Sequence, residues 1–295
     1  MRVRSAPLLV VPTFLASLIG LAASSSPAVA VLPICDVAIF EDPLGNTLLL
    51  TQDCETNHTI VVPDGKTLDG NGHSIFAVDP VSGDFTGAVV RNETTIPTGV
   101  IHVTNLTITG QLSIDQCDAG ADRLRGILFS GAGGTVTNTH LFDIRQGTAS
   151  GCQEGNAIEV RNFFPDEPLS SSSRISVTVS DNEVRNYQKT GILVNGNVEA
   201  VVARNLVVGD GPIDFIAQNG VQIGFGATAL VSANSISGNN YTPNSFFACG
   251  IIVVDADGVD RKQQDNLFPP NTDPMANEKD TCGFAKGGNY EPFGN

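Results

Sequence analysis

Short alternating apolar strands recur along the chain at a nearly constant spacing. Each begins with a small residue and continues with apolar residues at alternate positions. The first apolar residues of successive strands are 31, 34, 29 and 30 residues apart. A period in this range indicates stacked repeats, each of which needs its neighbours to bury its apolar face. The strands are Gly126-Ile127-Leu128-Phe129, Ala157-Ile158-Glu159-Val160, Gly191-Ile192-Leu193-Val194, Gly220-Val221-Gln222-Ile223 and Gly250-Ile251-Ile252-Val253.

A second motif, an Asn followed by one residue and then usually an apolar one, recurs within the same period. An Asn at the same turn of each repeat can take the left-handed conformation and hydrogen-bond to the Asn above and below. We therefore assign these residues to a structural ladder rather than to a ligand. They are Asn105, Asn138, Asn182, Asn205, Asn234 and Asn266.

The segment from Gly65 to Ile75, GKTLDGNGHSI, followed by the two repeated motifs, resembles the pectate-lyase-like right-handed β-helix repeat family over roughly residues 55 to 268. The resemblance implies an all-β, single-domain right-handed parallel β-helix, a solenoid of about seven coils. It says little about activity, because the superfamily includes lyases, hydrolases, epimerases and proteins without known catalysis. An antiparallel sandwich would instead show hairpin signals at every second turn, and the Asn-Gly pairs at 195 and 219 fall at different points of the repeat.

The first thirty residues have the order of a secretory signal peptide: Arg2 and Arg4, an apolar run from Leu8 to Ala23, and small residues up to Ala30. A membrane anchor is disfavoured, because the run contains Pro12 and is shorter than the roughly 20 apolar residues that span a bilayer. We expect a secreted, extracellular protein. The mature chain then divides into an N-terminal cap (31–56), the β-helix (57–268) and a C-terminal cap (269–295), with inserted loops at 111–125 and 163–174.

The mature chain is strongly acidic. Removing Arg2 and Arg4 from the 16 basic residues leaves 14 against 31 acidic ones, a formal charge of −17. Such a charge disfavours nucleic acid and anionic membranes as partners. It also disfavours a strongly anionic polymer unless calcium or a local basic patch intervenes. An extracellular carbohydrate is the expected partner.

All six cysteines lie in the mature chain, and an even number in an exported protein indicates disulfides. Six cysteines allow 15 pairings. Once the repeat is drawn, one pair staples each end and a third connects adjacent coils through an inserted loop. The favoured pairs are Cys35 with Cys54, Cys117 with Cys152, and Cys249 with Cys282.

Candidate site residues lie on the outward face of the repeated strand. If the Ile and Val of each strand point inward, the outward positions form two columns. One holds Leu128, Glu159, Leu193, Gln222 and Ile252, and the next holds Ser130, Arg161, Asn195, Gly224 and Val254. Aligning Ala88 to Asn92 with Ile158 to Asn162 places Arg91 in the column of Arg161, about 9.6 Å away, a spacing suited to acidic groups along a polymer.

Two functions remain open. An enzyme that cleaves polysaccharide by β-elimination needs a base and a cation that neutralises the uronate carboxylate. Its catalytic residues would be Arg161, Lys189, Tyr187 and Glu159, with Arg91, Asn195 and Gln222 binding substrate. The alternative is a non-catalytic β-helix that binds glycans or serves at the cell surface, in which Glu159 and Arg161 form only a weak surface ion pair.

Other chemistry has little support in the sequence. Asp210 and Asp214 do not form the paired aspartates of the hydrolases in this family. No cofactor motif is evident. Residues 255–260, DADGVD, resemble a calcium loop, but the Gly comes too early for an EF-hand, so a turn is the preferred interpretation.

Overall fold

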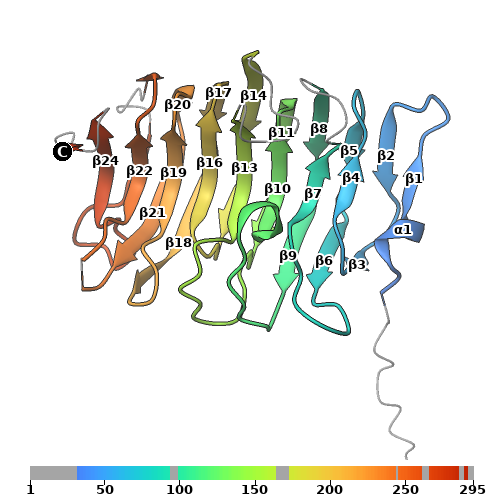
Figure 1. Cartoon of the computed structure of the whole chain (residues 1–295), viewed down its shortest axis with the longest axis horizontal. Coiled ribbons are helices and arrows are strands. Elements are labelled where there is room, and N and C mark those ends of the chain that lie inside the picture. The colour runs from blue at the N-terminus through green and yellow to red at the C-terminus, as the bar shows by residue number, and fades with distance from the viewer. Residues whose placement is uncertain are drawn as a thin grey trace, which may run out of the picture. The chain divides into compact units, whose positions relative to one another are not determined.

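The computed structural model of the protein describes residues 32–291 except for 94–98, 164–172, 244, 261–265 and 286–288. Within these ranges the regular structure is almost entirely β-strand, and the strands form three long sheets with mainly parallel pairing (Figure 1). The architecture is that of an all-β solenoid, as the repeat predicts. The predicted leader, residues 1–30, lies outside the described residues.

Sheet 1 contains the repeated strands that begin with a small residue. Its central column is fully buried and consists of Val90, Ile127, Ile158, Ile192, Val221 and Ile251, paired in register. In spatial order its strands are β4 (Ile60–Val62), β7 (Ala88–Asn92), β10 (Arg125–Ser130), β13 (Asn156–Asn162), β16 (Thr190–Gly196), β19 (Asn219–Gly224), β22 (Cys249–Val254), β24 (Lys279–Ala285) and β25 (Asn289–Glu291).

The small residue at the start of these strands is required by close approach of the backbone. A Cβ on Gly191 would lie 2.7 Å from the carbonyl oxygen of Gly220, and one on Gly220 would lie 2.6 Å from that of Gly250. A larger residue would therefore push the next strand away and break the ladder.

Sheet 2 follows sheet 1 along the chain and is built from strands rich in Val and Thr. Its buried column is Leu68, Val103, Val136, Val179, Val202 and Val231. Its strands are β1 (Ile39–Glu41), β2 (Thr47–Leu50), β5 (Thr67–Asp69), β8 (Val100–Thr104), β11 (Gly133–Thr137), β14 (Ile175–Ser180), β17 (Val198–Ala203), β20 (Thr228–Ser232) and β23 (Gly258–Asp260).

Sheet 3 completes each repeat before the chain returns to sheet 1. Its buried column is Ile75, Ile108, Leu141, Val184, Val207 and Ile236. Its strands are β3 (Cys54–Thr56), β6 (Ser74–Val78), β9 (Thr107–Gln111), β12 (His140–Phe142), β15 (Glu183–Arg185), β18 (Leu206–Ile213) and β21 (Ser235–Tyr241). The three buried columns face one another and form a single apolar core.

The described ranges hold only two short helical segments, α1 (Cys35–Ala38) and the 3-10 turn η1 (Gly120–Asp122). Neither is long and apolar enough to cross a membrane. At the ends of the described chain, β1 pairs with β2 and β25 pairs with β24, both antiparallel. The segment predicted to be a C-terminal cap thus also contributes a parallel strand, because β24 continues sheet 1 beside β22.

The predicted Asn ladder is present in the turns between sheets 2 and 3, but with fewer members. The side-chain amide of Asn182 donates to Asn205 at 2.9 Å, Asn205 donates to Asn234 at 2.9 Å, and Asn234 donates to Asn266 at 3.0 Å. All four are nearly inaccessible. A second bond from the amides of Asn182, Asn205 and Asn234 to a strand carbonyl satisfies both of their donor hydrogens, and the amide of Asn266 donates to the Val231 carbonyl.

The assignment of Asn105 and Asn138 to this ladder is wrong. The turns at 105–106, 138–139, 181–182, 204–205 and 233–234 have two residues each, and the first of the two is left-handed and exposed. Asn105 and Asn138 take that first position with φ of 52° and 53°, and both are exposed. In later repeats the left-handed residue is the one before the ladder Asn, for example Arg204 before Asn205.

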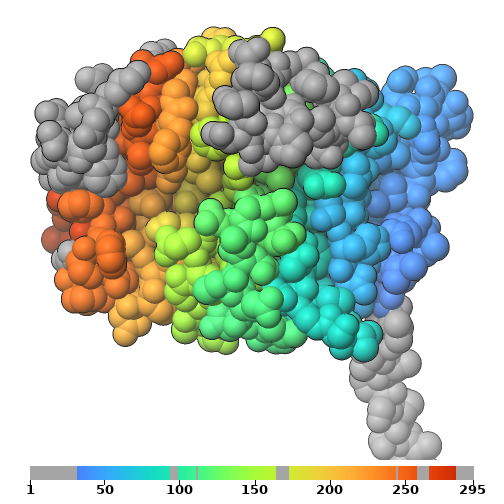
Figure 2. Space-filling view, viewed as in Figure 1, coloured from blue at the N-terminus to red at the C-terminus, as the bar shows by residue number. Residues whose placement is uncertain are grey.

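The structure contains the three disulfides that the repeat favours. Cys35 bonds to Cys54 beside α1, and Cys249 bonds to Cys282 between β22 and β24. Cys117 bonds to Cys152 and ties the long loop between β9 and β10 to the loop between β12 and β13. We call residues 112–124 the insert. Figure 2 shows green residues of this region on the surface in front of sheet 1.

Candidate functional site

The outward face of sheet 1 carries the predicted charged residues, but the predicted position of Arg91 was wrong. The columns of Glu159 and Arg161 are as predicted. Arg91, however, pairs with Leu128 and therefore lies in the column of Glu159. Val90 rather than Ala88 aligns with Ile127, a shift of two residues that keeps Arg91 on the outward face but moves it along the strand.

Glu159 is the centre of a buried polar network. Its carboxylate accepts hydrogen bonds from Arg125 Nε at 2.7 Å, Asn156 Nδ2 at 2.9 Å and Arg161 Nη1 at 3.2 Å. Only 3% of Glu159 is exposed. The ion pair between Glu159 and Arg161 is therefore not the weak surface pair that the sequence analysis considered. Because Glu159 is buried, removing its partner would cost considerable folding free energy.

Arg125, which the sequence analysis missed, connects this network to the insert. It is the largest fully buried side chain of the described residues. Beyond its bond to Glu159, its guanidinium donates to the carbonyl oxygens of Gly120, Ala121 and Arg123. All of these bonds are made to Glu159 and to the backbone of the insert. Arg125 and Glu159 therefore hold the insert against sheet 1.

The two arginines predicted to bind ligand are partly buried. The guanidinium of Arg161 packs over the ring of Phe163 at 5.2 Å, in addition to its bond to Glu159. Arg91 Nε is buried and has no hydrogen-bond partner among the described residues.

The loops that run from sheet 3 to sheet 1 enclose a cavity of about 770 Å³, which we call the loop cavity. It brings together residues from four successive connections and from the outward face of β19 and β22. Its lining consists of Gly151, Gln153, Lys189, Phe215, Ile216, Ala217, Asn219, Gln222, Tyr241, Ser245, Phe246, Phe247 and Ile252.

Among the described residues that line the loop cavity, Lys189 alone is charged. Its ammonium group donates to the carbonyl oxygen of Ala217 at 2.7 Å. Burial disfavours the charged form and lowers the pKa of Lys189 to about 8. The group can therefore bind an anionic or oxygen-rich ligand, and a large share of the molecules carry it as a neutral amine in mildly alkaline solution.

Aromatic and amide side chains provide the rest of the lining. Phe246 is 67% exposed and lies 6.1 Å from the ring of Tyr241, and Phe247 is 36% exposed. Asn219 and Gln222 project from β19, and Gln222 Nε2 contacts Asn195 Oδ1 at 3.4 Å. Apolar faces with a few convergent polar groups are typical of small-ligand sites.

The predicted site residues thus lie in three places: the loop cavity, the outward face of β7 and β13, and the core. Lys189 and Gln222 line the loop cavity, with Asn195 in contact with Gln222. Arg91, Glu159 and Arg161 lie on β7 and β13, and Glu159 is two strands from Gln222, about 9.6 Å along the sheet.

Tyr187 lies in the core, away from these groups. It is completely buried, its hydroxyl donates to Asn239, and burial raises its pKa. A phenol in this position cannot meet a polymer without opening the core.

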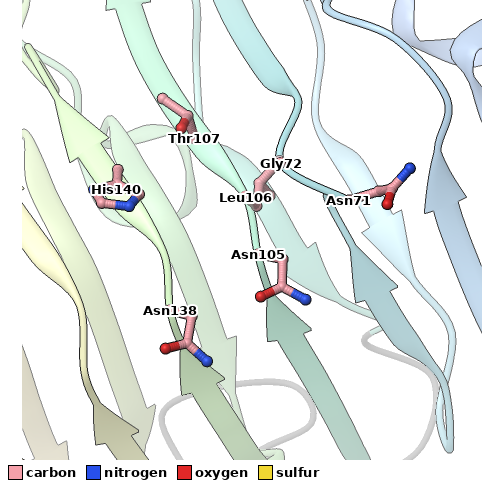
Figure 3. A pocket seen from close by; sticks show the side chains of 7 residues that line it. All are labelled: Asn71, Gly72, Asn105, Leu106, Thr107, Asn138 and His140. Carbon is pink, nitrogen blue, oxygen red and sulfur yellow. The ribbon is translucent and has the colours of Figure 1, made fainter.

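A second hollow of about 610 Å³ lies over the turns between sheets 2 and 3. Figure 3 shows Asn71, Asn105 and Asn138 side by side along successive repeats at its edge. All three have left-handed φ angles, which explains the choice of Asn there. His140, which is the ionisable residue among its described lining, pairs with Glu183 at 3.2 Å. Turn geometry accounts for these residues without a ligand.

Three carboxyl groups that no sequence motif indicated meet at the base of the insert. We call Asp84, Asp118 and Glu154 the carboxyl cluster. Asp84 and Glu154 are buried, and the backbone N–H of Asp118 donates to the Glu154 carboxylate at 2.9 Å. Burial and the neighbouring charges of Asp84 and Glu154 raise the pKa of Asp118 to about 6.

Only the first half of the calcium-like segment, residues 255–257, connects β22 to β23, with Asp255 left-handed, and residues 258–260 form β23 itself. Among the residues that the structure describes, no group of three or more His, Cys, Asp or Glu side chains is arranged to hold a metal ion.

The fold defines the class of protein as an all-β protein with long parallel sheets. The chain matches no protein-family model, no curated protein and no solved structure.

Proposed function

We propose that the protein is a secreted, right-handed parallel β-helix of about seven coils, similar to the pectate-lyase-like family, that binds an extracellular carbohydrate. The apolar leader, the even number of cysteines and the repeat support export and this architecture. Long loops on one side of the stack and short turns on the other favour a ligand on the loop side.

The lining of the loop cavity is the observation that carries the proposal. A sugar ring has apolar C–H faces and a rim of hydroxyl groups. The rings of Tyr241, Phe246 and Phe247 can pack against those faces, while Asn219 and Gln222 can hydrogen-bond to the rim. A volume of about 770 Å³ suits a short stretch of sugar residues.

A polysaccharide lyase is the second candidate, and Lys189 favours it. A neutral amine in the cavity could take the proton beside a uronate carboxylate, and the C–H electron pair would form the new C=C bond. The C–O bond to the leaving sugar would break, and the ammonium just formed on Lys189 would return its proton to the leaving oxygen. Binding is the better supported function, because Glu159 and Arg161 are engaged with each other and Tyr187 is in the core.

Titration calorimetry with a panel of neutral and uronate-containing oligosaccharides tests the proposal. We expect Phe246→Ala to weaken binding at least about tenfold, the usual effect of truncating an aromatic anchor. Phe40→Ala is the matched control, because Phe40 is 57% exposed and lies on β1, outside the cavity. Equal affinity in both variants, or no binding to any oligosaccharide, would refute the proposal.

The same samples separate binding from cleavage. Formation of unsaturated products from a uronate oligosaccharide, abolished by Lys189→Met, would establish the lyase. Bound but unchanged oligosaccharide after long incubation supports a binding protein.

A further inference from the structure

Phe225 is an exposed aromatic residue with an unfavourable backbone conformation. Its φ is 53°, whereas the other described non-glycine residues with a positive φ are Asn, Asp, Arg or Ala. A left-handed conformation brings Cβ close to the following carbonyl oxygen and disfavours a bulky side chain. The residues that follow β10 and β22 at the equivalent position are Gly131 and Asp255, which tolerate a positive φ better. Because the Phe225 side chain is 48% exposed, burial in the core does not offset this strain.

The ring of Phe225 belongs to a small aromatic surface at the corner where sheet 1 passes into sheet 2. Phe163 follows β13, and its ring lies 6.1 Å from that of Phe225 in an edge-on arrangement. The strand between them, β16, ends at Gly196, which has no side chain to separate the two rings (Figure 1). The guanidinium of Arg161 packs over the ring of Phe163 at 5.2 Å. We call Arg161, Phe163 and Phe225 the corner platform.

The corner platform and the loop cavity are connected along β19. Gln222 lines the cavity, and Phe225 follows it by three residues, roughly 10 Å along an extended strand. Between them Gly224 contributes only backbone, because a Cβ there would lie 2.8 Å from Asn195 Oδ1. The same Asn195 oxygen is 3.4 Å from Gln222 Nε2. The polar edge of the cavity therefore continues towards Phe225 with no large side chain of β19 between them.

Packing within the protein is a poor explanation for an aromatic ring at position 225. Phe129, which serves the core, is completely buried, whereas nearly half of Phe225 meets solvent. Backbone strain at an exposed residue is typical of positions that contact a ligand. An exposed ring beside amide groups suits a sugar, whose apolar C–H face packs on the ring.

We propose that the corner platform is a second sugar-binding subsite, and that one carbohydrate chain reaches it from the loop cavity along the direction of β19. The proposal rests on the proposed function, because it extends the ligand of the loop cavity. The chain crosses the stack from one end of the sheet 1 strands to the other. Affinity should therefore increase with chain length until the ligand reaches Phe225.

Titration calorimetry with cello-oligosaccharides and oligogalacturonates, each from the disaccharide to the hexasaccharide, tests the proposal. Phe225→Asn removes the ring and introduces a residue that tolerates the φ of 53°. We expect the wild type to bind the hexasaccharide of one series at least about tenfold more tightly than the disaccharide, the usual contribution of an aromatic anchor. Phe225→Asn should lose this gain and bind the disaccharide as the wild type does.

Two further variants separate failure of this proposal from failure of the proposed function. Phe246→Ala should weaken disaccharide and hexasaccharide alike, because Phe246 lines the cavity. Phe40→Asn is the matched control, since Phe40 is an exposed phenylalanine on β1 and should affect neither ligand. If Phe246→Ala weakens binding but Phe225→Asn binds the hexasaccharide as tightly as the wild type, the corner platform alone is refuted. If the wild type binds no oligosaccharide, or Phe246→Ala has no effect, both proposals fail.

Thermal unfolding without ligand gives a readout on which a structural role for the ring has the opposite effect. Relief of the backbone strain should leave the Tm of Phe225→Asn at or above the wild-type value, by up to about 3 °C. A lower Tm would show that the ring of Phe225 stabilises the fold, and it would overturn the assignment of this residue to a ligand.

Discussion

The turns between sheets 2 and 3 differ sharply from the loops between sheets 3 and 1. From 105–106 to 233–234 the former have two residues each, a left-handed residue outside and, in the later repeats, a ladder Asn inside. The latter range from the three residues between β3 and β4 to the insert, and they form the loop cavity and the carboxyl cluster. Repeated turns therefore stabilise the stack, whereas irregular loops bring unusual chemical groups together.

The largest effect should follow removal of Arg125, which joins the regular stack to an irregular loop. Arg125→Met leaves Glu159 buried with only Asn156 and Arg161 as partners. Breaking a buried ion pair costs about 3–5 kcal/mol in the free energy of unfolding. Urea denaturation measures the loss, and a loss below about 1 kcal/mol would show that the network is not structurally important.

The second largest loss of stability should follow a change in the Asn ladder. Asn205→Ala removes the donor to Asn234 and to the Val179 carbonyl, leaving buried acceptors unsatisfied, at a cost of about 2–3 kcal/mol. Asn105→Gly is the control in the same kind of turn, because it is exposed and glycine tolerates its φ of 52°. If both variants lost equal stability, the distinction between the two turn positions would be wrong.

Replacing Lys189 should increase the free energy of unfolding, whereas the two changes above decrease it. A lysine whose folded pKa is lowered to about 8 destabilises the protein below that pH, and the loss disappears as pH rises towards the unfolded value. Lys189→Met should therefore stabilise the protein at pH 6 by roughly 1–3 kcal/mol. The gain should be smaller at pH 10, and a destabilised variant at pH 6 would contradict the assignment of Lys189 to a functional site.

Asp118 should give the smallest effect on global stability. Its pKa is raised in the folded state, so the folded protein holds more protons than the unfolded one, and stability falls as pH rises from about 4 to about 6. Partial exposure limits the loss to about 1–2 kcal/mol. Urea denaturation at pH 4.5 and 7 compares the wild type with Asp118→Asn, in which this component of the pH dependence should vanish.

The sequence was sufficient to predict the strands, their inward residues and the disulfides, because these depend on a repeat that every coil obeys. Arg91 was predicted two residues away from its true position along the strand. The segments VVRN (89–92) and EVRN (159–162) are similar in sequence, but they do not pair in the same register. Tyr187 was expected near a ligand, although its ring fills the core.

The loop cavity and the carboxyl cluster could not be predicted in the same way. Phe246 and Gln153, or Asp84 and Glu154, meet only because loops of different repeats fold over one another. Those conformations are set by individual contacts, such as the bonds from Arg125 to the insert, which no periodicity expresses. Lys189 and Gln222 were found because each adjoins or belongs to a repeated strand.

The most direct test of the central claim, that the irregular loops rather than the regular stack carry the function, is hydrogen exchange with and without a bound oligosaccharide. The account predicts slower exchange in residues 151–153, 215–219 and 245–247, and no change in the turns at 105–106 and 138–139. Protection confined to the face around Arg91 and Arg161, or to those turns, would contradict it.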